Sequence, residues 1–127
     1  MLDLRRLTLL GQGCECTCYA LSRGRVLKTF RTAFERDRAW SRQKKAYRAG
    51  IAPPTLGILD SRTRYGYVSA RVTEIGLADG GFLRRPMNQI GLSSHDLRPD
   101  NIGKWKGRVV AIDFGDLSMN SWRLGAS

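Results

Sequence analysis

The segment from Ser94 to Gly115 constrains this chain most, because it places three oxygen-bearing side chains around one short hairpin. Asn101 follows Asp96 by five residues, and Asp113 comes directly after the second strand of the expected hairpin. A carboxylate can orient an attacking hydroxyl group, and amide and carboxylate oxygens are ligands of magnesium. The segment therefore predicts a phosphotransferase in which Asn101 and Asp113 share one metal site.

Length and terminal sequence set wider limits. The chain has 127 residues, room for one compact domain, and its 42% apolar composition is ordinary for a globular protein. It has no apolar run of the roughly 18 residues that a membrane helix needs. Asp3, Arg5 and Arg6 stand where a signal peptide would be apolar. We therefore expect a cytoplasmic protein with no membrane segment.

The charge of the chain is strongly positive. Lys and Arg number 22 against 11 Asp and Glu, a formal net charge of +11. Ten of the basic residues lie between Arg23 and Arg48, where only Glu35 and Asp37 oppose them. Such a field attracts anions in general, so ATP, nucleic acid and an acidic partner protein all remain open as partners.

Patterns of apolar and turn residues predict an α+β fold. A helix should begin after the N-cap Thr32, with Glu35 completing a capping box, and end near Arg48 before Gly50. Its predicted buried seam repeats every seven residues at Ala33, Trp40 and Tyr47, with Ala39 and Ala46 beside it. The expected strands, five in an antiparallel sheet, cover residues 7–10, 17–21, 25–30, 55–59 and 65–70, with a turn at Gly11-Gln12-Gly13.

The second half of the chain predicts less regular structure. Its glycines and Pro86 leave room for at most a short helix around residues 82–90. Residues 102–105 and 109–112 flank Lys106-Gly107, a sequence typical of a tight turn, and predict a small hairpin.

Four motifs in order resemble those of one superfamily. Leu10 to Gly13 resembles the start of a glycine-rich loop, Val26 to Lys28 a strand with a phosphate-binding lysine, His95 to Asn101 a catalytic loop, and Ile112 to Gly115 a metal-binding motif. The chain thus resembles a much shortened member of the protein kinase and aminoglycoside phosphotransferase superfamily. The resemblance implies a single minimal kinase-like domain over residues 1–127, with the small lobe in 1–74 and a remnant of the large lobe in 75–127.

The resemblance also implies the cofactors ATP and Mg²⁺ and a role for each site residue. Asp96 would position the acceptor hydroxyl, and Arg98 would neutralise charge on the transferred group. The remaining residues would hold the nucleotide and its metal: Gly11, Gln12, Gly13 and Lys28 for the phosphates, Glu35 for Lys28, and Asn101 and Asp113 for magnesium.

Several residues keep a second interpretation. Lys28 could be a solvated strand lysine, and Asp96 and Asn101 could be turn formers. The carboxylate that pairs with Lys28 could be Glu35, which could instead only cap the helix, or Asp37; the superfamily's usual spacing falls near Ala39, which has no carboxylate.

The cysteines also allow two interpretations. Cys14, Cys16 and Cys18 alternate and would share one face of a strand, where they could bind zinc or copper(I). We expect them to be reduced and buried as small apolar side chains instead. Cys16 stands where the superfamily has its third loop glycine.

Three functions remain open. The first is an ATP- and magnesium-dependent phosphotransferase with a hydroxyl acceptor, and the second a pseudokinase that binds a nucleotide or regulates a partner. The third is a basic nucleic-acid-binding protein. Only 12 residues follow Gly115, too few for a substrate-binding lobe. Either another chain, in an oligomer or complex, completes the site, or the substrate docks without such a lobe.

Overall fold

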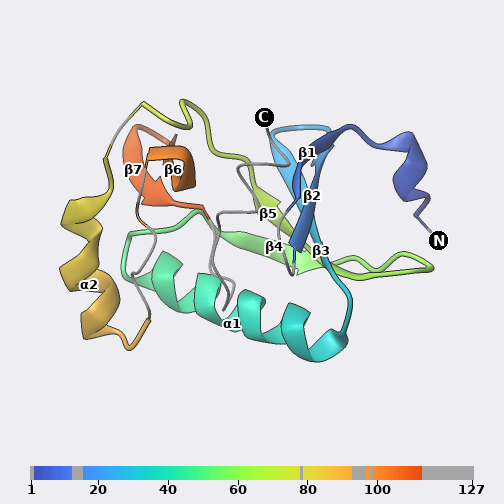
Figure 1. Cartoon of the computed structure of the whole chain (residues 1–127), viewed down its shortest axis with the longest axis horizontal. Helices are drawn as coiled ribbons and strands as arrows, with labels where there is room; N and C mark the ends of the chain where they lie inside the picture. Colours follow the sequence, from blue (N-terminus) through green and yellow to red (C-terminus); the bar gives the residue numbers. More distant parts are fainter. Residues whose placement is uncertain (1, 13–15, 78, 93–96, 98, 113–127) are drawn as a thin grey trace.

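The computed structural model describes residues 2–12, 16–77, 79–92, 97 and 99–112. It has the predicted α+β class, with a five-stranded antiparallel sheet, one long helix and a separate hairpin (Figure 1). Among the described residues, no helix is both long enough and apolar enough to cross a lipid bilayer. The elements in chain order are η1 (Leu4–Arg6), β1 (Leu9–Gln12), β2 (Cys16–Leu21), β3 (Arg25–Phe30), α1 (Ala33–Arg48), β4 (Thr55–Ile58), β5 (Tyr65–Ala70), η2 (Gly81–Leu83), α2 (Arg84–Gln89), η3 (Pro99–Asn101), β6 (Ile102–Trp105) and β7 (Arg108–Ala111).

The sheet has the strand order β1-β2-β3-β5-β4, and every neighbouring pair is antiparallel. Helix α1 connects β3 to the edge strand β4, and β5 then returns between those two strands. Figure 1 shows α1 running along one side of the sheet, with α2 and the β6–β7 hairpin at the end away from the N-terminus. This order places β3 at the centre of the sheet, between β2 and β5.

The first strand differs from its prediction. Gly11 and Gln12 were expected in a turn, but they belong to β1 and pair with Cys18 and Thr17 of β2. The register shifts between Leu9 and Gly11, so a bulge carries the pairing further along the chain than apolar alternation indicates. The predictions for residues 25–30 and 65–70 are confirmed.

The start and end of α1 follow from local chemistry, as predicted. The Thr32 hydroxyl oxygen accepts a hydrogen bond from the Glu35 backbone N–H at 3.1 Å and donates to the Glu35 carboxylate at 2.9 Å. After Arg48 the chain reaches Gly50 with φ of 79°, a left-handed conformation that glycine adopts without strain.

The predicted buried seam of α1 is wrong in part. Tyr47 is 43% exposed, and the buried positions follow a neighbouring stripe: Arg36, Ala39, Gln43 and Ala46. Two polar residues occupy that stripe because both find partners inside the fold. The Arg36 guanidinium donates to the Asp60 carboxylate at 2.8 Å and to the Gly66 carbonyl at 3.2 Å. Hydrogen bonding therefore allows two polar residues to share the buried face of α1 with Ala39 and Ala46.

The β6–β7 hairpin has the predicted turn. Lys106 and Gly107 have φ of 51° and 76°, the pair of positive angles that a two-residue turn of type I′ requires. Helix α2 is short, as expected for its glycine- and proline-containing segment.

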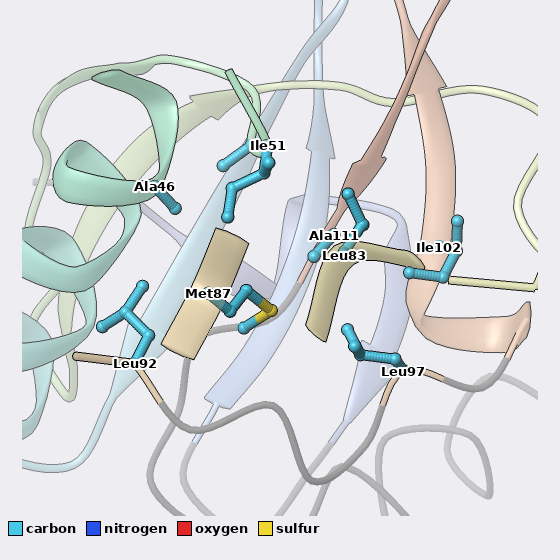
Figure 2. Close-up of a cluster of buried hydrophobic side chains, with 9 residues drawn as sticks. Ala46, Ile51, Leu83, Met87, Leu92, Leu97, Ile102 and Ala111 are labelled. Atoms are coloured by element: carbon cyan, nitrogen blue, oxygen red, sulfur yellow. The ribbon is translucent and has the colours of Figure 1, made fainter. Parts of the chain in front are cut away.

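The second half of the chain is anchored by an aliphatic cluster. Figure 2 shows side chains from α1, α2 and the hairpin pointing toward one another. Gly80 lies against this cluster, and a Cβ atom built on it would collide with the Ile102 side chain. The cluster comprises Ala46, Ile51, Ala52, Leu83, Met87, Leu92, Leu97, Ile102 and Ala111. Burial of these groups fixes the hairpin against the end of α1.

Candidate functional site

Lys28 is buried in the middle of the sheet. Lys28 is 7% exposed. Its Nζ donates hydrogen bonds to the Gln43 Oε1 atom at 3.1 Å and to the backbone carbonyl oxygen of Ile112 at 2.7 Å. The nitrogen also lies 5.8 Å from the centre of the Tyr67 ring. The solvated-lysine interpretation is therefore wrong, and Lys28 is a cation held inside the fold.

The second partner of Lys28 belongs to the hairpin. Ile112 lies 84 residues after Lys28 and directly precedes Asp113. Its N–H donates to the backbone oxygen of Asn101 at 3.1 Å, and Asn101 is 2% exposed. The ends of the hairpin, one at Asn101 and the other at Ile112, thus meet beside the lysine.

The side chain that holds Lys28 on α1 is an amide. Glu35 lies in the first turn of the helix, where its carboxylate accepts a hydrogen bond from the N-cap Thr32, and Asp37 pairs with the Arg36 guanidinium at 2.6 Å. Gln43, one turn beyond Ala39, occupies the position facing the lysine. Among the described residues, no carboxylate forms an ion pair with Lys28.

Gln43 uses its full hydrogen-bonding capacity. Its Oε1 accepts from Lys28 and from the Tyr67 hydroxyl at 2.7 Å, while its Nε2 donates to the Pro53 carbonyl at 2.9 Å and to the Ser69 hydroxyl at 2.7 Å. A carbonyl oxygen only accepts, so Nε2 must face Pro53 and the amide oxygen must face the lysine. The sequence prediction missed Gln43. A polar residue on the stripe of Ala39 and Ala46 was the available signal.

The glycine-rich segment and the lysine share one row of the sheet. Gly11 pairs with Cys18, Cys18 with Lys28, and Lys28 with Tyr67. Directly opposed residues of antiparallel strands point to the same face, so Gly11 lies on the lysine's face two strands away. Gln12 is next in β1 and exposed.

Cysteines of β2 pack into the same side of the sheet. Cys16 and Cys18 are each 3% exposed, and Cys16 belongs to a cluster with Phe30, Ala39 and Tyr67. The Phe30 and Tyr67 rings stack at 5.9 Å between centroids. The two described cysteines therefore act as small buried side chains, as expected, and Cys14 lies outside the described residues.

Several predicted site residues, namely Gly13, Asp96, Arg98 and Asp113, lie outside the described residues. Leu97, between two of them, is 5% exposed in the aliphatic cluster, and its carbonyl accepts from the Gly80 N–H at 3.1 Å. Within the described part of the chain, no three His, Cys, Asp or Glu side chains gather as a metal site. The described part of the site is thus the buried lysine, its amide partner and the ends of the hairpin.

Comparison with known proteins gives no family assignment: no protein-family model matches the sequence, and no curated protein matches it.

Proposed function

We propose that this chain is a minimal kinase-like phosphotransferase that uses ATP and magnesium. The proposal depends on one observation above all, the 2.7 Å hydrogen bond from Lys28 Nζ to the Ile112 carbonyl. It joins the lysine of the third strand to the residue before Asp113, across most of the chain. The proposed kinase-like small lobe is supported by a five-stranded antiparallel sheet in which α1 follows the strand that carries the lysine.

The chemistry of the donor set fits a nucleotide phosphate. An ammonium group has three protons, and the described residues supply acceptors for two of those of Lys28. Its third proton remains to bind a phosphate oxygen. Burial strengthens that attraction, because the effective dielectric constant inside a protein is far below that of water.

The other predicted residues complete the proposal. Asn101 and Asp113 would hold magnesium, which neutralises charge on the phosphates when bound. Asp96 would orient an acceptor hydroxyl and accept its proton, and Arg98 would stabilise negative charge that develops on the transferred group. Gly11 and Gln12 would border the phosphates from β1, and Gly13, the next residue in the sequence, would belong to the same loop motif.

Transfer of radiolabelled γ-phosphate tests the proposal. We expect Mg-ATP to label the protein or an added hydroxyl acceptor, and Asp96→Asn and Asp113→Asn each to abolish labelling. Asp79→Asn is the matched control, because Asp79 is exposed and accepts a backbone hydrogen bond from Gly81. Labelling that survives in both site variants would contradict the proposed roles.

Gln43 favours a second candidate function. A neutral amide holds the lysine where the superfamily resemblance implies a carboxylate, and such a departure is compatible with a pseudokinase that binds a nucleotide without transferring its phosphate. Binding of Mg-ATP without any labelling, in the wild type and all variants, would support this second function.

A further inference from the structure

The Gln43 network distinguishes between an amide and a carboxylate. The Nε2 atom of Gln43 lies 2.9 Å from the Pro53 carbonyl oxygen, which only accepts hydrogen bonds. A carboxylate oxygen at the same place would face another acceptor and gain no hydrogen bond from it. The site therefore favours a neutral side chain that can donate to Pro53 and accept from Lys28.

The same network leaves the charge of Lys28 uncompensated among the described residues. Its two hydrogen-bond acceptors, Gln43 Oε1 and the Ile112 carbonyl, are neutral. Burying a cation without a counterion is unfavourable, and an anion that reaches it recovers much of that free energy. A bound anion would thus supply the counterion that Lys28 lacks among the described residues.

We propose that Gln43 is a positioning residue that holds Lys28 as a buried cation whose counterion is the bound phosphate chain itself. This inference rests on the proposed function and extends it to the basis of ligand recognition. A preformed lysine–carboxylate pair would have to share its cation with the phosphates, whereas the described acceptors of Lys28 carry no charge.

Gln43→Glu gives the sharpest test, because it adds one negative charge without changing side-chain length. At pH 8 we expect the dissociation constant for Mg-ATP, measured by calorimetry, to rise about tenfold or more. The matched control is Gln89→Glu on α2, which makes the same chemical change at an exposed position. Its affinity should equal that of the wild type.

A pH series separates positioning from a purely structural role. Among the described residues, Lys28 and Tyr67 are the titratable groups that form hydrogen bonds with the Gln43 side chain. A protonated carboxyl group can donate to Pro53 and accept from Lys28, as the amide does. Relative to the wild type at each pH, the affinity of Gln43→Glu should therefore recover as the pH falls and the introduced carboxyl group is protonated. A constant ratio across the series would overturn the proposal.

A second experiment does not depend on the folding of Gln43→Glu. It tests whether a phosphate chain acts as the counterion of Lys28. Inorganic tripolyphosphate without magnesium should raise the melting temperature of the wild type and of Lys45→Met, whose lysine is exposed on α1. Lys28→Met removes the same charge and should lose this increase. An equal increase in both variants, or none in the wild type, would contradict the proposal.

Failure of the inference differs from failure of the proposed function. If the wild type binds Mg-ATP and Gln43→Glu binds it equally well or more tightly at pH 8, the inference is wrong and nucleotide binding stands. If the wild type does not bind Mg-ATP, the proposed function is wrong.

Discussion

The two halves of the molecule bury different chemistry. Beneath the sheet lies a polar network centred on Gln43, whose four hydrogen bonds reach Lys28, Tyr67, Pro53 and Ser69. Beside the hairpin lies an aliphatic cluster (Figure 2). The polar network has directional side-chain contacts and fixes the orientation of one cation, whereas the side chains of the aliphatic cluster hold short elements in place by apolar burial. The candidate site forms where the hairpin, held by the cluster, reaches the cation.

Gln43→Leu should have the largest effect on stability. It leaves a buried cation with one acceptor fewer and removes the partner of three other buried polar groups. We expect the free energy of unfolding in urea to fall by about 3–5 kcal/mol. The control Gln89→Leu alters an exposed position of α2 and should change the free energy of unfolding little. A loss below about 1 kcal/mol for Gln43→Leu would show that the polar network is not a principal support of the fold.

Ile102→Ala tests how much the aliphatic cluster contributes to the free energy of unfolding. Ile102 is completely buried, and truncating such a side chain removes apolar contacts and leaves a cavity. The free energy of unfolding should fall by about 2–5 kcal/mol. Ile75→Ala, at a residue 49% exposed, is the control. Similar losses in the two variants would mean that the cluster does not anchor the hairpin.

Gly80→Ala should cost less than the cavity variant. The added methyl group would collide with the Ile102 side chain and lie 3.1 Å from the Leu97 carbonyl oxygen. Overpacking of this kind typically costs about 1–3 kcal/mol. Gly81→Ala is a close control, because the nearest described atom to a Cβ there is an Asp79 carboxylate oxygen, at 3.5 Å, an ordinary van der Waals distance. Urea unfolding that does not separate the two would argue against close packing at Gly80.

Tyr67→Phe should have the smallest effect. It removes one hydrogen bond to Gln43 Oε1 while Lys28 still donates to that atom, so we expect a loss of about 1 kcal/mol. Tyr65→Phe on the same strand, 42% exposed, serves as the control. A loss as large as that of Gln43→Leu would mean that Tyr67, and not Gln43, is the centre of the network.

Local sequence signals were sufficient for much of the fold. The Thr32 cap, the alternation of β3 and the Lys106-Gly107 turn each depend on neighbouring residues, and each was predicted. The extent of β1 was not, because the pairing of Gly11 and Gln12 depends on β2. The buried face of α1 was also missed in part, because Arg36 and Gln43 are buried through partners on distant strands and loops.

The candidate site likewise has a part that the sequence predicted and a part that it missed. Lys28 was selected from the order of motifs, and its burial depends on contacts that a single strand cannot reveal. Gln43 was missed because its partners lie 10 to 26 residues away. Contacts of that range arise from the tertiary fold, which residue periodicity does not encode.

The affinity of Mg-ATP for Lys28→Met, measured by calorimetry beside the wild type and Lys45→Met, tests the central claim most directly. Both variants lose one positive charge, but Lys28 is buried and donates to the Ile112 carbonyl, whereas Lys45 is exposed. We predict that the wild type and Lys45→Met bind with similar dissociation constants and that Lys28→Met binds at least about tenfold more weakly. Equal affinity in all three proteins would contradict a phosphate site at Lys28.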